Sequence, residues 1–236
     1  MKAIIGGTGV DRISNFSSER REIITPYGMV ELFVGTGRHS SLVFLPRHGS
    51  SHSVPPHLIN YRANITALKE LGVEALISIY AVGSVTDTLK PGEIGTLSDF
   101  VDLSGGGREH TFFTGDGSGV EHVGMVSVFD ADLTDSLHAG DASLKKAGVY
   151  VCTNGPRLET PAEIRMFKLL GFDVVGMTAA TEVALAREAG IKVASLVYSI
   201  NWAAGVGPDE VVFIGNYEIV KLKDKMISLS LKVLGA

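Results

Sequence analysis

Three short loops place hydrogen-bond donors directly after apolar, strand-like segments of the chain. In the first loop, Gly6-Gly7-Thr8-Gly9, the glycine N–H groups and the Thr8 hydroxyl can donate to an anion. In the second, the guanidinium of Arg47 stands beside the imidazole of His48, a pairing suited to an oxyanion such as phosphate. The third loop carries Thr178. Because no loop pairs a nucleophile with a base, together they predict a protein that binds inorganic phosphate as a reactant.

Each of these loops also has a simpler interpretation. The glycines at positions 6–9 could form only a structural tight turn, since the dinucleotide fingerprint needs glycine at the position of Arg12 and no Walker lysine follows. A single basic pair such as Arg47 and His48 is often merely solvated. Thr178 could do no more than cap a helix.

The spacing of two histidines raises the question of a metal site. His48 and His52 are four residues apart, which on a helix would place both on one face. However, Gly49-Ser50-Ser51 between them and Pro55-Pro56 after them disfavour a helix. We therefore expect no metal site here.

An apolar and an acidic side chain come just before a predicted helix. Thr160, Pro161 and Glu163 match the N-cap, the first helical position and the acidic partner of a capping box, so the helix should begin at about Pro161. Leu158 and Glu159 then lie in the turn before it, where open α/β sheets bind ligands. The alternative is that both residues only help to cap this helix.

The composition is that of a single globular domain over residues 1–236, with 45% hydrophobic and 20% charged residues. A net charge of -5 and scattered positive residues argue against a nucleic-acid partner. The amino-terminal segment is too short and glycine-rich for a signal peptide, and no apolar run reaches about eighteen residues. The chain is therefore expected to be cytoplasmic, without a membrane partner. Cys152, the only cysteine, should be a buried, chemically quiet thiol.

Alternating strand and helix patterns position the candidate loops. Strands are predicted over residues 2–5, 29–34, 41–45, 73–82, 93–100, 149–153, 173–177 and 192–200. Helices are predicted over residues 60–71, 133–147, 161–170 and 181–189, with a last helix capped by Asn216, and a mobile glycine-rich loop over 104–119. This order predicts an α/β fold in a single domain, with a mixed, largely parallel central sheet flanked by helices.

Six motifs occur in an order that resembles the trimeric purine nucleoside phosphorylase and 5′-methylthioadenosine phosphorylase family. The resemblance runs from Ile4 to about Ala204. The motifs are Gly6-Gly7-Thr8-Gly9, Arg47-His48-Gly49, Asn60-Tyr61-Arg62-Ala63-Asn64, Ala81-Val82-Gly83-Ser84, Asn154-Gly155-Pro156-Arg157-Leu158-Glu159-Thr160-Pro161-Ala162-Glu163 and Gly176-Met177-Thr178 followed by Glu182.

The resemblance implies a role for each candidate residue. Thr8, Arg47, His48, the backbone of Ala81, and Thr178 would surround phosphate. Met177 would lie against the ribose. His122 matches a histidine that reaches the sugar of a neighbouring subunit, which implies a homotrimer or a hexamer of two trimers. Leu158 stands where the family usually stacks a phenylalanine on the base, so this chain keeps an apolar face without an aromatic ring.

The donors and acceptors of two residues indicate the type of base. Glu159 is an acceptor and suits the N1–H of a 6-oxopurine, while Asn201 can donate to O6 and accept from a protonated N7. Adenine-specific members resemble one another in having aspartates at the positions of Asn201 and Ala203, which this chain lacks. The alternative is that Glu159 belongs to the nearby capping box and Asn201 only ends a strand.

The implied reaction is phosphorolysis of a purine ribonucleoside, with Asn201 and His48 as catalytic residues and phosphate as co-substrate without any cofactor. The 5′ group of the nucleoside is less readable. Residues 208–214 contain apolar side chains and no histidine, which favours a methylthio group, and Phe213, Ile214 and Ile219 are candidates to contact it. Two alternatives stay open: a methylthioadenosine phosphorylase, and a non-enzymatic phosphate- or nucleotide-binding protein on the same scaffold.

Overall fold

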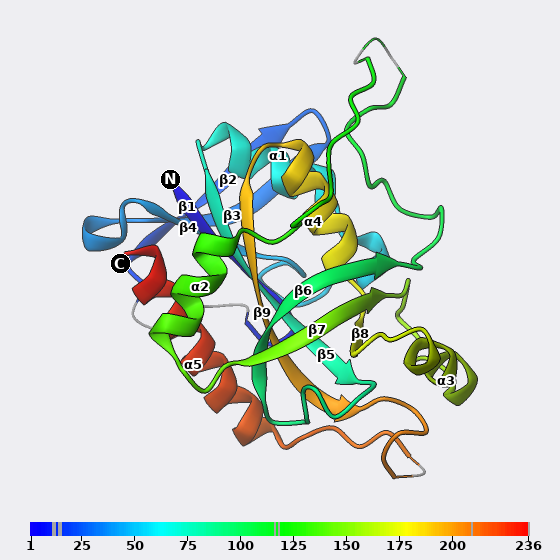
Figure 1. Ribbon diagram of the computed structural model, residues 1–236. Helices are drawn as coiled ribbons and strands as arrows, with labels where there is room; N and C mark the ends of the chain where they lie inside the picture. Colours follow the sequence, from blue (N-terminus) through cyan, green and yellow to red (C-terminus); the bar gives the residue numbers. More distant parts are fainter. Residues whose placement is uncertain (11–12, 14–15, 116, 118, 209, 236) are drawn as a thin grey trace.

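A computed structural model describes residues 1–10, 13, 16–115, 117, 119–208 and 210–235. Within these residues one sheet has the strand order β2-β3-β4-β1-β5-β8-β7-β6-β9, with a further pairing of β5 and β9. This last pairing closes β5, β8, β7, β6 and β9 into a ring. The remaining strands extend the sheet from β5 (Figure 1).

The strands and helices are bounded as follows. The strands are β1 (Lys2–Gly6), β2 (Ser18–Thr25), β3 (Gly28–Gly35), β4 (Leu42–Pro46), β5 (Ala75–Ser84), β6 (Ile94–Asp102), β7 (Lys145–Cys152), β8 (Val174–Gly176) and β9 (Lys192–Trp202). The α-helices are α1 (Tyr61–Glu70), α2 (Ala131–Gly140), α3 (Pro161–Leu169), α4 (Ala179–Glu188) and α5 (Asn216–Leu234), with two short 3-10 turns at Gly37–His39 and Pro56–Leu58.

The predicted mixed α/β sheet is confirmed, with parallel and antiparallel pairs in one sheet. Strand β1 runs parallel to β4 and β5, β5 parallel to β9, and β7 parallel to both β6 and β8. The antiparallel pairs are β2 with β3, β3 with β4, β5 with β8, and β6 with β9. The carboxyl ends of β1, β4, β5 and β9 consequently meet at one edge of the sheet.

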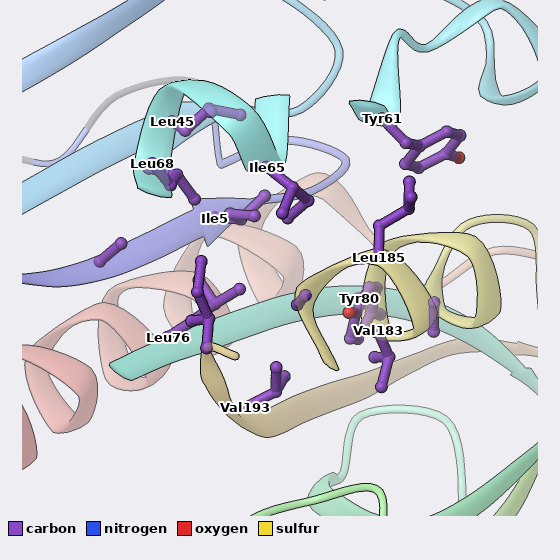
Figure 2. Packing of buried hydrophobic residues seen from close by; sticks show 14 of the residues in the cluster. Ile5, Leu45, Tyr61, Ile65, Leu68, Leu76, Tyr80, Val183, Leu185 and Val193 are labelled. Atoms are coloured by element: carbon purple, nitrogen blue, oxygen red, sulfur yellow. The ribbon is translucent and has the colours of Figure 1, made fainter. Parts of the chain in front are cut away.

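Helices cover both faces of the sheet, which explains why its central strands are almost continuously apolar. Successive residues of β1 point to opposite faces: Ala3 and Ile5 pack with α1 and α4, whereas Ile4 packs with α2 and α5. Figure 2 shows the first of these cores, where Ile65 and Leu185 of the two helices lie over the sheet. Because α1 and α4 pack on one face of the sheet and α2 and α5 on the other, the strands and their ends are held in place from both sides.

Three details of the predicted elements differ from the structure. The helix predicted over residues 133–147 ends at Gly140, because Asp141 has extended backbone and its carboxylate accepts the N–H of Ser143, so that β7 begins at Lys145. Strand β2 was not predicted, since it is a largely exposed edge strand that carries charged side chains. The cap of α5 is Gly215, one residue before the predicted Asn216.

The predicted glycine-rich loop has no helix or strand in its described residues between 104 and 119. Parts of the sequence predictions fall outside the described residues, namely at Arg12, Asp116, Ser118, Asp209 and Ala236. In the described part of the chain, no helix combines the length and apolar character needed to cross a membrane.

Candidate active site

A cavity of about 220 Å³ opens where the carboxyl ends of β1, β4, β5, β8 and β9 come together. Of the candidate residues predicted from the sequence for phosphate, base and ribose, it brings together all except His122. These lining residues are Thr8, Arg47, His48, Ala81, Leu158, Glu159, Met177, Thr178 and Asn201. A cavity lined by both apolar and polar groups at strand ends is the usual form of a small-molecule site in α/β proteins.

Arg47 is held by a network of buried polar groups beneath this cavity. Its Nε donates to Glu182 Oε2 at 2.6 Å and its Nη2 donates to Glu182 Oε1 at 2.8 Å. Nη2 also donates to Ser78 Oγ at 2.6 Å, and Nη1 donates to the Ile79 carbonyl at 2.9 Å. The hydroxyls of Ser78 and Tyr80 both donate to Glu182 Oε1. The two charges therefore form a bidentate pair that fixes the guanidinium plane.

This pairing determines what Arg47 can offer to a ligand. A guanidinium has five N–H bonds, and the contacts above use all but one, on Nη1. Burial alone would lower the pKa of Arg47, but the carboxylate of Glu182 raises it well above its ordinary value, so the guanidinium stays charged. Arg47 thus offers an oriented donor whose charge is already largely balanced by Glu182.

Residue 7 must be glycine for the first loop to approach this network. A Cβ there would lie 2.6 Å from Arg47 Nη1 and 2.6 Å from the Ile79 carbonyl oxygen. Such contacts are too short for any side chain. The glycine therefore lets the backbone before Thr8 pass directly against the guanidinium.

His48 has a defined protonation state. Its Nδ1 lies 2.8 Å from the carbonyl oxygen of Val54, which can only accept, so Nδ1 carries the proton. Burial, followed by the charge of Arg47, lowers the pKa of His48 to about 4. The ring is neutral at physiological pH, and its unprotonated Nε2 can accept a hydrogen bond from a hydroxyl group.

Thr178 lies at the amino terminus of α4, on the cavity wall. Its side chain makes no capping hydrogen bond, which leaves the hydroxyl for another partner. The backbone N–H groups of Thr178 and Ala179 point to the buried Tyr150 hydroxyl, at 3.1 and 3.4 Å. The positive end of the α4 dipole adds to the favourable potential for an anion here.

The other end of the cavity carries Asn201 and Glu159. Asn201 is buried and donates one Nδ2–H to the Trp202 carbonyl at 2.8 Å, which leaves its Oδ1 and a second N–H. Glu159 Oε1 accepts from Thr153 Oγ1 at 2.6 Å. The capping box of α3 is completed by Glu163, so the alternative that Glu159 serves as its acid is excluded.

Apolar side chains line the space between these two polar ends. Met177, Val211 and Phe213 contribute to it, together with the half-exposed Leu158. Of the three candidates for the 5′ group, Phe213 lines the cavity, whereas Ile214 and Ile219 pack against the core beneath α5. The cavity lining therefore combines hydrogen-bond donors, apolar side chains, an amide and a carboxylate.

His122 does not line the cavity of its own chain. It is exposed, on the long connection between β6 and α2 that extends away from the sheet in green in Figure 1. Because His122 is exposed on this chain, it is accessible to a second chain.

A sequence model of the phosphorylase superfamily matches residues 2–226 of the chain. The chain belongs to the phosphorylase superfamily. It is 46% identical over 212 residues to a probable 6-oxopurine nucleoside phosphorylase of Dictyoglomus turgidum, covering 88% of this chain and 80% of that protein. It is 43% identical over 228 residues to a probable S-methyl-5′-thioinosine phosphorylase of Methanothermobacter thermautotrophicus, covering 94% and 79%.

Solved structures of the phosphorylase superfamily show the same fold. A variant of the adenosine/methylthioadenosine phosphorylase from Schistosoma mansoni, in complex with methylthioadenosine, matches this chain with a TM-score of 0.85 at 31% identity. The match covers 98% of this chain and 88% of that one. The resemblance drawn from the six motifs is thereby confirmed.

Sequence reasoning missed three polar residues of this superfamily member that act behind the cavity wall. Glu182 was quoted in a motif without a role, although an acid one helical turn after Thr178 was the available signal. Tyr150 and Arg108 gave no signal, because their contacts come from segments far apart in the sequence. Among the described residues, no cluster of His, Cys, Asp and Glu could hold a metal ion.

Proposed function

We propose that the protein is a purine nucleoside phosphorylase that cleaves 6-oxopurine ribonucleosides with phosphate. The products are the free base and ribose 1-phosphate, or its methylthio form. The observation that carries this proposal is one cavity whose lining combines the oriented donor of Arg47 with the amide of Asn201 and the carboxylate of Glu159. The amino-acid identities to superfamily relatives of this activity support the same conclusion.

The phosphate end is assigned to Thr8, Arg47, His48, Ala81 and Thr178. The free N–H of Arg47 and the hydroxyls of both threonines donate to phosphate oxygens, and neutral His48 accepts from a hydroxyl of phosphate or sugar. Phosphate held in this way attacks C1′ as the bond from C1′ to the purine nitrogen breaks. Catalysis at this end is positioning, which removes the entropy cost of bringing the two reactants together.

The base end is assigned to Asn201, Glu159 and Leu158. As the glycosidic bond breaks, its electron pair passes into the purine, which takes up a proton at N7 from solvent, balanced by the proton that hydrogen phosphate loses when it bonds to C1′. Asn201 Oδ1 accepts from N7–H, its free N–H donates to O6, and Glu159 accepts from N1–H. The contact from the Asn201 N–H to O6 strengthens as negative charge develops on the base, and the contact from N7–H to Asn201 Oδ1 stabilises the protonated purine; together they lower the barrier. Met177 lies against the ribose.

The apolar lining near Phe213 and Val211 suits a 5′-methylthio group as well as an ordinary ribose with its 5′-hydroxyl. The proposal therefore includes 5′-methylthioinosine beside inosine and guanosine. No cofactor is part of it, since the chain's own donors fill every role named above. We place the enzyme in the cytoplasm, without a nucleic-acid or membrane partner, as a homotrimer or hexamer in which His122 reaches a neighbour's sugar.

The rival activity is phosphorolysis of methylthioadenosine, and the base end separates the two. With Glu159 ionised, N1 of adenine meets an acceptor, and its amino group meets the donor of Asn201. Each buried mismatch of this kind costs about 1–3 kcal/mol. We predict that Asn201→Asp shifts the preference toward 6-aminopurines by about tenfold or more, because an acceptor then faces the amino group.

The measurement is the ratio of kcat/KM for methylthioinosine to that for methylthioadenosine in both proteins. Asn216→Asp is a matched control, because it makes the same chemical change at an exposed position outside the cavity lining. An unchanged ratio in Asn201→Asp, or an equal change in the control, would remove Asn201 from the base site. Stoichiometric binding without turnover of any nucleoside would instead favour a non-enzymatic role.

A further inference from the structure

The glycine-rich segment after β6 leads into a buried arginine. Ser104 bonds back to Asp102 through its backbone and hydroxyl, Gly105 turns the chain with φ +76°, and Arg108 then enters the protein. Arg108 is 6% exposed, although the segment around it lies on the surface. An arginine is seldom buried without a specific set of partners.

Among the described residues, the hydrogen-bond acceptors of Arg108 lie at or just beyond the ends of β7 and β8, beginning with Cys152 Sγ at 3.9 Å from Nη1. Nε donates to Asn154 Oδ1 at 3.1 Å, and Nη2 donates to the carbonyl oxygens of Asn154 at 2.6 Å and Thr153 at 3.3 Å. Nη1 donates to the carbonyl oxygen of Met177 at 2.6 Å. The guanidinium carbon lies 5.8 Å from the centre of the Tyr61 ring. One cation thus ties together the two strand ends that lead to the base and ribose end of the cavity.

We infer that Arg108 is a positioning residue for nucleoside binding. This inference rests on the proposed function. Thr153, held through its carbonyl, donates from its hydroxyl to Glu159 Oε1 at 2.6 Å, so Arg108 fixes the residue that aims the base carboxylate. Met177, held through its carbonyl, presents its side chain to the cavity. Arg108 therefore orients both groups without contacting the substrate.

The packing of Gly155 makes this arrangement specific. A Cβ on residue 155 would lie 2.4 Å from Met177 Sδ, so the Met177 side chain fits against a bare backbone next to Asn154. Any shift of the Asn154 backbone would displace Met177 as well. A lysine could not replace Arg108, because an ammonium is a point charge and lacks the planar set of donors needed for four oxygen acceptors on two strands.

The test is steady-state kinetics of Arg108→Lys with each substrate varied in turn. We expect the KM for inosine or methylthioinosine to rise about tenfold or more, while the KM for phosphate stays within about twofold. Thr8, Arg47, His48 and Ala81 lie in or just after β1, β4 and β5, to which Arg108 makes no hydrogen bond in the described part of the chain, and the backbone N–H of Thr178 is held separately by the Tyr150 hydroxyl. We also expect weaker preference for 6-oxopurines over 6-aminopurines, since Glu159 loses its orientation.

Arg62→Lys is the matched control. Arg62 also holds the segment after β6, donating from Nε to the Thr111 carbonyl at 2.7 Å and pairing with Glu109 at 3.0 Å, but it has no hydrogen bond to either strand end. If Arg108 only tethers the segment, both variants should change all kinetic constants alike. A second variant, Asn154→Ala, removes the Nε acceptor at an exposed position and should raise the nucleoside KM in the same direction by a smaller factor.

The outcomes separate this inference from the proposed function. If the wild-type protein releases no base from any purine nucleoside, the proposed function fails. If the wild-type protein is active but Arg108→Lys and Asn154→Ala leave the nucleoside KM unchanged, or raise the phosphate KM equally, the inference about Arg108 is overturned. If Arg108→Lys does not fold, the nucleoside KM of Asn154→Ala decides alone. A raised value supports the inference about Arg108, and an unchanged value overturns it.

Discussion

Glu182 is the residue that gives Arg47 its orientation. In isolation, an arginine after a strand could be solvated or could bind phosphate in many geometries. Glu182 removes this freedom by holding Nε and Nη2 with its two carboxylate oxygens, while Ser78 and Tyr80 satisfy the carboxylate from the other side. A buried pair of this kind contributes little net stability, but breaking it is costly. The pair matters here because it fixes the direction of the remaining N–H on Arg47 Nη1.

Replacing the acid should therefore affect phosphate more than nucleoside. We predict that Glu182→Gln raises the KM for phosphate by about tenfold or more and changes the nucleoside KM much less, because the amide loses the charge that fixes the guanidinium. Initial rates at varied phosphate test this. Glu188→Gln, on the same helix, keeps its acceptor for the Phe112 N–H and should leave phosphate kinetics unchanged. Equal phosphate KM values in all three proteins would contradict this role for Glu182.

At the scale of elements, most of the site depends on where strands end and helices begin. The capping box of α3 has Thr160 Oγ1 accepting from the Glu163 N–H and the Glu163 carboxylate accepting from the Thr160 N–H. It fixes the first turn of α3 directly after Leu158 and Glu159. A cap of this type stabilises a helix start and also the angle at which the preceding turn enters it.

We predict that Thr160→Ala lowers the free energy of unfolding by about 1 kcal/mol, while Thr160→Ser stays close to wild type because it retains the capping oxygen. Urea denaturation followed by circular dichroism measures both. An alanine variant with the wild-type midpoint and slope would show that this cap does not contribute to stability.

The strand ends and caps could be predicted from sequence because their signals are local. Apolar runs, glycines and the pattern from Thr160 to Glu163 determined where Arg47, Glu159 and Thr178 lie relative to the sheet. The helix over residues 133–147 was wrong because apolar spacing continued past Asp141, whose side chain stops the helix. Arg108 was missed because its partners come from residues 153, 154 and 177, and no local pattern joins them.

At the scale of the whole molecule, the ends of β1, β4, β5 and β9, with the loops that follow β7 and β8, bring the cavity-lining candidate residues together. The same molecule carries an exposed apolar face on and just after α3, where Met166, Leu169 and Leu170 are 45%, 87% and 61% exposed. Apolar side chains grouped in this way are typical of surfaces that contact another protein. This observation supports the proposed oligomer.

We predict that the active species sediments as a trimer or a multiple of three, and that His122→Ala keeps this mass but raises the nucleoside KM. The reason is that His122 is exposed and does not line the cavity of its own chain, so we propose that it acts in a neighbour's site. Sedimentation velocity at enzyme concentrations used for kinetics tests the assembly. A fully active monomer would refute the assignment of His122, although not the roles of the residues lining the cavity.

The most direct test of the central claim is release of free base by the wild-type protein. Inosine, 5′-methylthioinosine and 5′-methylthioadenosine are each incubated with and without phosphate, and hypoxanthine or adenine is quantified. The donors around Arg47 and the pairing of Asn201 with Glu159 predict rapid release of hypoxanthine only when phosphate is present, with much slower release of adenine. Base release that does not require phosphate, or a preference for methylthioadenosine over both 6-oxopurine nucleosides, would contradict the account.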